Sequence, residues 1–289
     1  RTGSKAVKNV VGYDLTRLIV GSEGTLAVIT QVVLRLIPRP PVQVTLRADF
    51  EGVDAAVEAV SGVLRARVVP ATLELVDGEC LDAVSRYLGE ALAPAGTGAV
   101  LLIEVDGFPE AVRAEAHAVE AACRAAGASS VSRAATAAER DALWRIRREL
   151  SPALKTISSV KLNNDVVVPR GRVPELFELV EQLRRDLRLR IPCFGHAGDG
   201  NIHVNIMVDE GDADGLARAR QAIPLLFEGV VALEGSISGE HGIGFTKAPY
   251  LAIELSADAI ALMQRVKQAF DPHGILNPGK IFPPGHRAG

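Results

Sequence analysis

The sequence predicts an α+β protein in which helices pack on one face of a sheet. From residue 42 onward, segments of strand character alternate with segments of helical periodicity. The helical segments are rich in Ala, Glu and Arg, which is typical of solvated helix faces. Two successive units of strand–helix–strand character indicate a sheet layer whose apolar face is covered by helices.

The first 40 residues form a separate unit in this interpretation. Its first two apolar runs predict strands over 18–20 and 26–30, and a third apolar run covers 32–37. A glycine-rich turn at residues 21–25 separates the first two runs. The proline-rich residues 38–41 break the pattern, so we expect one domain over 1–40 and a second over 41–289.

The second domain is expected to alternate strands with helices along its whole length. The predicted strands cover 42–48, 71–76, 100–105 and 165–169, followed by a hairpin over 191–208. The predicted helices cover 52–66, 109–126, 137–154, 173–189, 212–230 and 255–269. No exact repeat accompanies this alternation.

Composition excludes several classes of function. The net charge of -3 lacks the basic footprint of a nucleic-acid-binding protein. No apolar run approaches the roughly 20 residues of a spanning helix, and no signal peptide is recognised. Because the chain starts at Arg1 without Met, we interpret it as a piece of a longer protein. The expected location is the cytoplasm, with peripheral association at the inner membrane as an alternative.

The three cysteines are too few and too scattered for a disulfide framework. We expect Cys80, Cys123 and Cys193 to be small buried residues in a reducing compartment. Cys193 lies three residues before a histidine, so a ligand role is the alternative for this one.

Two short glycine-rich segments hold three of the six histidines in the chain. The first segment contains His196 and His203 on either side of a Gly-Asp-Gly-Asn sequence, in which Asp199 is expected to cap the turn. These residues accept positive φ angles, so the chain can reverse tightly there. A reversal would bring both imidazoles to one rim, within reach of one ion at about 2 Å per bond.

The second segment contains Glu240 and His241 between glycines. Adjacent side chains on extended backbone point to opposite sides. Glu240 can therefore complete a His-His-Glu ligand set, while His241 serves as general base. Asn205 shares a strand face with His203 and can orient a ligand or a substrate oxygen. The segments predict a metal-assisted enzyme, although each histidine alone could be a hydrogen-bonded structural residue.

These segments resemble the signatures of FAD-linked D-2-hydroxy acid dehydrogenases, a family that includes glycolate oxidase, D-lactate dehydrogenase and D-2-hydroxyglutarate dehydrogenase. The resemblance covers residues 195–203 and 239–244, residues 8–15 and 21–26, and residues 270–280. It implies a ferredoxin-like cap domain of the FAD-linked oxidase C-terminal type, with an antiparallel sheet and packed helices. The last strands of a FAD-binding domain of the vanillyl-alcohol-oxidase type would precede it.

The resemblance also implies cofactor positions. His196, His203 and Glu240 match the metal ligands of metal-bearing members, usually zinc, iron or manganese, and His241 matches the base. The FAD-contacting residues are expected to be Gly21, Ser22, Glu23, Gly24, Thr25 and Asn277.

Substrate-contacting positions follow from the same resemblance. Arg147 matches an arginine that binds a substrate carboxylate, a role for which a planar guanidinium fork is suited. The alternative is an exposed helix arginine like Arg145. Asn205 and Lys161 match residues near the substrate, and Ser151 lies one helical turn beyond Arg147 on the same face.

The implied reaction oxidises a D-2-hydroxy acid, such as glycolate or D-lactate, to the 2-oxo acid with hydride transfer to FAD. The expected partners are this small acid, other oxidase subunits and an electron acceptor, namely a quinone, a cytochrome or an electron-transfer flavoprotein. Two alternatives stay open. One is a metal-dependent hydrolase without flavin, and the other is a non-catalytic acid-binding cap subunit.

Overall fold

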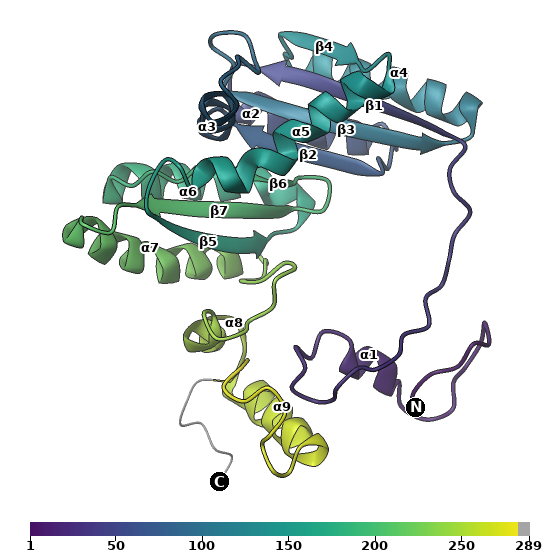
Figure 1. Cartoon of the computed structure of the whole chain (residues 1–289), viewed down its shortest axis with the longest axis vertical. Helices are drawn as coiled ribbons and strands as arrows, with labels where there is room; N and C mark the ends of the chain where they lie inside the picture. The colour runs from purple at the N-terminus through teal and green to yellow at the C-terminus, as the bar shows by residue number, and fades with distance from the viewer. Residues whose placement is uncertain (283–289) are drawn as a thin grey trace. The chain divides into compact units, whose positions relative to one another are not determined.

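The computed structural model describes residues 1–282, which fall into two compact units (Figure 1). The larger unit is Arg39–Gly239, and the smaller unit combines residues 1–38 with the chain from Glu240 onward. The proline-rich boundary expected near residue 40 lies at the start of the larger unit. Residues 283–289 of the expected second domain lie outside the described residues.

One seven-stranded sheet forms the centre of the larger unit. Its strands are β1 (Val42–Phe50), β2 (Thr72–Asp77), β3 (Ala99–Gly107), β4 (Ser130–Arg133), β5 (Val160–Val167), β6 (Cys193–His196) and β7 (Asn201–Val208). They lie in the order β4-β1-β3-β2-β6-β7-β5, and every neighbouring pair is antiparallel. The predicted α+β class with an antiparallel sheet is confirmed.

The sheet consists of two halves with matching strand order. In the first half β1, β3 and β2 lie side by side, and in the second half β5, β7 and β6 do the same. The helices are α2 (Val53–Arg65), α3 (Gly78–Leu88), α4 (Pro109–Ala125), α5 (Ala137–Leu154), α6 (Val173–Leu187) and α7 (Ala213–Ala232). Strand β4 adds a fourth strand beside β1, and Ser236 makes an isolated bridge to Val167 at the corresponding edge of the second half. Each half therefore follows the ferredoxin-like pattern of strand, helix, two strands and helix.

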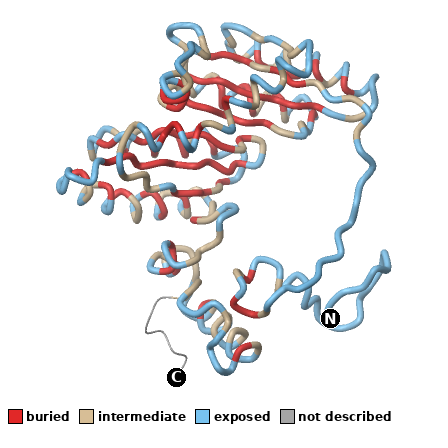
Figure 2. The backbone as a smooth tube through the Cα atoms, in the orientation of Figure 1, coloured by how far each residue is buried: buried red, intermediate tan, exposed pale blue. Residues whose placement is uncertain are grey.

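Helices cover both faces of this sheet, so the expectation of helices on one face is wrong. α2 packs on α4 and α6, and α6 packs on α7. On the other face α3 and α5 bury an apolar cluster that includes Val76, Leu102 and Phe194 of the sheet. Figure 2 shows buried residues running along the strands between these helices. Side chains alternate along a strand, so the α5 face also carries Glu74, His196 and their neighbours in register.

Helix α3 and strand β4 are absent from the sequence-based prediction. The signals for α3 were present, because the Asp77 carboxylate caps its start by accepting from the Cys80 N–H, and Gly89 ends it with a φ of 71°. Strand β5 begins at Val160, five residues earlier than predicted. Its first half is polar at Lys161 and Asn163, which obscures the apolar pattern of a strand.

The α-helices in the described residues of the smaller unit are α1 (Leu15–Ile19), α8 (Leu251–Glu254) and α9 (Ala257–Phe270). The strand predicted at 18–20 is wrong, because Asp14 caps α1 there by accepting from the Arg17 N–H. The segments 26–30 and 32–37 pair with no strand among the described residues. A strand needs a neighbouring strand to bond its N–H and C=O groups. Several apolar residues of these segments are also exposed, with Leu36 at 85%.

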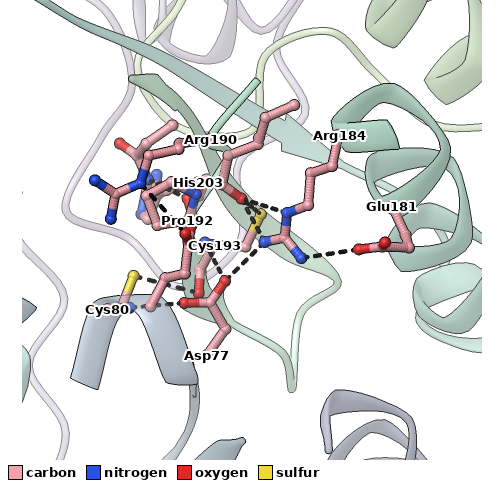
Figure 3. Close-up of polar contacts among 11 residues, drawn as sticks. Asp77, Cys80, Glu181, Arg184, Arg190, Pro192, Cys193 and His203 are labelled. Atoms are coloured by element: carbon pink, nitrogen blue, oxygen red, sulfur yellow. Dashed lines mark hydrogen bonds and ion pairs between the residues drawn. The ribbon is translucent and has the colours of Figure 1, made fainter. Parts of the chain in front are cut away.

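A buried ion pair joins the two halves of the sheet (Figure 3). Asp77 ends β2, and its carboxylate accepts from the Cys193 N–H at 2.7 Å and from Arg184 Nη2 at 2.9 Å. Burial raises the pKa of Asp77, while Arg184 and the two backbone N–H groups oppose that rise. This pair fixes the beginning of β6, the strand that carries His196.

Candidate active site

His196 and His203 meet on one face of the sheet, as the sequence predicts. In the β6–β7 hairpin His196 lies opposite Asn201, and His203 lies opposite Phe194. The two imidazole rings have centroids 5.9 Å apart and an interplanar angle of 76°. The strands approach closely at Gly195, where a Cβ atom would lie 2.4 Å from the Asn201 carbonyl oxygen. Glycine at this position is therefore required for the hairpin that brings the histidines together.

The turn between the histidines forms through backbone rather than side-chain bonds. The Asp199 N–H donates to the His196 carbonyl at 2.9 Å, while the Asp199 side chain is 78% exposed. The expected side-chain cap by Asp199 is therefore wrong. Gly200 has a φ of 78°, and a Cβ atom there would lie 2.1 Å from the Val168 carbonyl oxygen.

Each of the two imidazoles lies beside a buried carboxylate that the sequence pattern did not reveal. Glu74 of β2 is 3% exposed, and its Oε1 contacts His196 Nδ1. Asp165 of β5 is fully buried, with its Oδ1 3.7 Å from His203 Nδ1 and 2.7 Å from Asn201 Nδ2. Knowledge of the strand register would identify both acids, because Glu74 lies opposite His196 and Asp165 lies opposite His203.

Glu74 also binds Arg147 of α5. Arg147 Nε donates to Glu74 Oε2 at 2.6 Å, and the guanidinium lies 4.8 Å from the centroid of the Phe194 ring. Burial opposes ionisation of Glu74, but His196 and Arg147 outweigh it, so the pKa of Glu74 lies below its ordinary value. The Arg147 side chain is 23% exposed against 50% for Arg145, which excludes the alternative of a surface arginine.

Trp144 and Arg147 fix α5 on the sheet at two points. One helical turn before Arg147, the Trp144 indole Nε1 donates to Glu104 Oε2 at 3.1 Å. Glu104 is 6% exposed and also accepts from the Thr45 hydroxyl at 2.6 Å. Trp144 and Arg147 thus each engage a buried carboxylate of the sheet.

Lys161 and Ser151, each expected near the substrate, lie in contact with one another. Lys161 Nζ donates to Ser151 Oγ at 2.9 Å. Burial of the ammonium, together with the nearby charge of Lys155, lowers the pKa of Lys161. Lys161 and His203 lie on the same face of neighbouring strands, since Lys161 pairs with Met207 and Asp165 with His203.

Asn205 is fully buried, and the nitrogen of its side-chain amide bonds to the backbone. Its Nδ2 donates to the Pro192 carbonyl at 3.2 Å and to the His203 carbonyl at 2.9 Å. Within residues 1–282, Asn205 Oδ1 is a buried atom with no hydrogen-bond partner. A substrate contact by Asn205 remains a prediction, and Oδ1 is the atom that would make it.

Glu240 and His241 belong to the smaller unit. The preceding residue, Gly239, ends the larger unit and donates its N–H to the Asp165 carbonyl at 3.3 Å. The roles of Glu240 as third ligand and of His241 as base therefore remain predictions. Within the smaller unit, Glu23 binds the backbone just beyond His241, accepting from the N–H groups of Ile243 and Gly244.

The residues expected to contact FAD hold segments of the smaller unit together. Thr25 Oγ1 donates to the Ser22 carbonyl at 2.7 Å, and Asn277 Nδ2 donates to the Glu23 carbonyl. A Cβ atom on Gly24 would touch the Asn277 side chain at 3.8 Å. Gly21, Gly24 and Asn277 are exposed, so contact with FAD through these residues stays a prediction.

The three cysteines are free and buried, as predicted. Burial raises the pKa of each thiol, and that of Cys123 reaches about 11. Side chains alternate along β6, so Cys193 points to the face of the sheet opposite to that of Phe194 and His196. Its Sγ contacts the Ile191 carbonyl, which argues against a ligand role.

Comparison with known proteins assigns the chain to a family. Residues 39–281 match the family of FAD linked oxidases, C-terminal domain. The chain is 42% identical over 282 residues to the glycolate oxidase subunit GlcD of Bacillus subtilis (strain 168), covering 98% of this chain and 60% of that protein. It is 32% identical over 289 residues to the mitochondrial D-lactate dehydrogenase (cytochrome) of Arabidopsis thaliana, covering 98% of this chain and 50% of that protein. The chain belongs to the family of FAD linked oxidases and carries their C-terminal domain.

Solved structures agree at the level of the fold. p-Cresol methylhydroxylase superposes with a TM-score of 0.67 at 14% identity, covering 87% of this chain and 55% of that one. 4-Ethylphenol oxidase from Gulosibacter chungangensis gives a TM-score of 0.62 at 17% identity, covering 88% and 56%. The chain thus spans little more than half the length of these relatives. None of the helices in residues 1–282 has the length and apolar character needed to cross a membrane.

The donor chemistry of the larger unit fits a divalent transition-metal ion. Two imidazoles share one face, and His196 Nδ1 contacts the buried Glu74 carboxylate, the arrangement in which an outer carboxylate orients a metal-binding histidine. His203 Nδ1 lies 3.7 Å from the buried Asp165 carboxylate. The remaining imidazole nitrogens are borderline ligands that suit zinc, iron or manganese. His196 and His203 would hold the ion, with Glu240 as the expected third ligand.

Proposed function

We propose that this chain supplies the substrate-binding half of an FAD-dependent, metal-assisted dehydrogenase of D-2-hydroxy acids. The observation that carries the proposal is the contact chain from His196 through Glu74 to Arg147. It sets a metal-binding imidazole beside a cationic fork suited to a carboxylate. A 2-hydroxy acid presents the matching groups, a hydroxyl and a carboxylate on adjacent carbons.

Different residues of the chain would bind the substrate and accept its hydroxyl proton. Arg147 binds the substrate carboxylate, and Lys161, held by Ser151, adds a second cation on the same face. His241 accepts the hydroxyl proton at a ring nitrogen. When bound, the ion supplies Lewis acidity that lowers the pKa of the substrate hydroxyl, and FAD supplies the acceptor for the hydride from C2. Asn205 Oδ1 and Glu240 complete the polar groups around the substrate and the ion.

The proposal extends to partners. The relative in Bacillus subtilis is named as a subunit of glycolate oxidase, which favours assembly of the present protein with other oxidase subunits. The relative in Arabidopsis thaliana is named with a cytochrome. We propose that the reduced flavin is reoxidised by an acceptor such as a cytochrome, a quinone or an electron-transfer flavoprotein.

A substrate panel with a dye acceptor tests this function in the full-length protein. Glycolate, D-lactate and D-2-hydroxyglutarate are compared with the corresponding L-acids, with and without a chelator. We expect turnover of at least one D-acid or glycolate that is lost on chelation and restored by a divalent ion. Turnover that is unchanged after verified metal removal would exclude the metal role. Ester or amide hydrolysis without flavin reduction would favour a hydrolase, and acid binding without turnover would favour a non-catalytic subunit.

Two variants test the residue roles. His241→Ala should abolish turnover while sparing the metal content. Arg147→Met should raise KM by about tenfold or more, because a charge-assisted bond to the carboxylate is lost. Arg145→Met, a matched change on the same helix, should leave KM unchanged. Equal effects of the two arginine variants would contradict the assignment of Arg147.

A further inference from the structure

Glu74 occupies an unusual position among the acids of the larger unit. It lies on β2 at the junction of the two half-sheets and is 3% exposed. One carboxylate oxygen contacts His196 Nδ1, and the other accepts from Arg147 Nε. A single buried carboxylate therefore touches both a proposed metal ligand and the proposed carboxylate-binding residue.

The contact with His196 determines which ring nitrogen can bind an ion. An ionised carboxylate only accepts hydrogen bonds, so His196 Nδ1 must carry the proton. In the neutral ring the lone pair then lies on Nε2, the nitrogen farther from Glu74. Such outer carboxylates fix both the tautomer and the orientation of a metal-binding imidazole.

The contact with Arg147 determines which edge of the guanidinium is available. Glu74 Oε2 accepts the hydrogen bond from the Arg147 Nε–H. Neither Nη atom of Arg147 donates a hydrogen bond to another of the described residues. The Phe194 ring supports the guanidinium from one side, with its centroid 4.8 Å away. The remaining N–H groups are thus left to bind a carboxylate at a fixed place.

We propose that Glu74 is a shared positioning residue, which orients His196 toward a metal ion and Arg147 toward a substrate carboxylate at the same time. This positioning role depends on the proposed function only for which ligands His196 and Arg147 bind. One carboxylate that holds both groups fixes the distance between them. Metal binding and acid binding then depend on a single side chain that touches neither ligand.

The neighbouring strand offers a matched control. Glu104 of β3 is 6% exposed and also fixes α5, through Trp144, yet its bonds go to Trp144, Thr45 and Gln43. Replacing either acid by glutamine removes a buried negative charge beneath the same helix. Only Glu74→Gln changes the surroundings of His196 and Arg147.

The first test needs neither metal nor turnover. His196 Nδ1 and Arg147 Nε contact different oxygens of Glu74, and glutamine replaces one of these oxygens with an NH₂ group that donates, so one of the two contacts is lost. In ¹⁵N-resolved NMR of the metal-free full-length protein, His196 should be the Nδ1–H tautomer in the parent and in Glu104→Gln. In Glu74→Gln we expect a shift of the His196 tautomer or of the Arg147 Nε–H resonance. Unchanged resonances for both groups would overturn the proposal.

The second test measures the two affinities separately. Zinc titration of the metal-free protein should give a Kd that is about 10- to 100-fold weaker in Glu74→Gln. Binding of oxalate to the metal-free protein should weaken by about tenfold in the same variant, while Glu104→Gln changes neither constant by more than about twofold. Parent-like affinities in Glu74→Gln contradict the positioning role. Failure of the parent protein to bind zinc or oxalate contradicts the proposed function instead, and the NMR result then decides the role of Glu74.

Discussion

Glu23 and Ile243 are 220 residues apart in sequence, yet Glu23 Oε1 accepts a hydrogen bond from the Ile243 N–H at 2.8 Å. The second carboxylate oxygen accepts from the Gly244 N–H at 2.7 Å. Gly242 has a φ of 72°, which favours glycine, and a Cβ atom there would lie 2.5 Å from Glu23 Oε1. One side chain from near the start of the sequence therefore holds the peptide that follows His241.

Replacing this carboxylate should loosen the smaller unit. Glu23→Gln leaves one acceptor for two backbone N–H groups and removes the charge that strengthens both bonds. We expect a loss of about 1.5–3 kcal/mol in the free energy of unfolding, or faster proteolysis near residue 243 if this unit unfolds separately. Glu228→Gln, at an exposed site on α7, is the control and should change neither quantity.

Acid should weaken the same unit through Asp271. Lys267 Nζ and the N–H groups of Ile275 and Leu276 bind its carboxylate, and they lower the pKa of Asp271 to about 2 against an ordinary value of 3.8. A depressed pKa in the folded state means that this stabilisation is present above about pH 4 and is lost as the pH falls toward 2. Melting temperatures between pH 5 and pH 2 should therefore fall less steeply in Asp271→Asn than in the parent. A parent-like slope in that variant, matching an Asp186→Asn control, would contradict the assignment.

The ion pair at the junction of the half-sheets should contribute strongly to stability. Arg184→Met leaves the buried carboxylate of Asp77 without its cation, so we expect a loss of about 3 kcal/mol in the free energy of unfolding. Arg185→Met is a matched control on the next residue of α6, where the side chain is 67% exposed. Denaturant unfolding measures both variants. Similar losses in the two would show that Asp77 does not depend on Arg184.

The β6–β7 hairpin should not tolerate a side chain at Gly195. In Gly195→Ala the added methyl group would lie 2.4 Å from the Asn201 carbonyl oxygen and 2.9 Å from Ile202 Cα, so the strands must separate. We expect a loss of about 1–3 kcal/mol in stability together with weaker zinc binding. Gly211→Ala is the control, because a methyl group there would have no heavy atom of the described residues within 4 Å beyond its chain neighbours. Equal melting temperatures for the two variants would exclude the close approach as the reason for glycine.

Most of the larger unit could be predicted from the sequence, because its apolar periodicity is strong. The helix over 137–154 was predicted with the bounds that α5 has, and the hairpin that joins His196 to His203 followed from its glycines. The first 40 residues could not be predicted in the same way. Their apolar runs have strand character, but no neighbouring strand among the described residues supplies the hydrogen bonds that a sheet requires.

The buried acids of the site were missed for a different reason. Glu74 lies in a short apolar strand, where nothing local distinguishes a buried, paired carboxylate from a solvent-facing one. Its importance comes from pairing with His196, and that pairing depends on the register of two strands distant in sequence. Arg147 could be singled out through its resemblance to a family motif, whereas its partner carried no comparable signal.

The pairing of Glu74 with His196 also has a consequence for folding. The two residues are 122 positions apart, whereas the β6–β7 hairpin closes over a few residues. Closing the longer loop costs more chain entropy, so the hairpin can form before β2 meets β6. We therefore expect the junction to form late, so the contact between Glu74 and His196 would distinguish a chain that has reached its native topology from one that has merely collapsed.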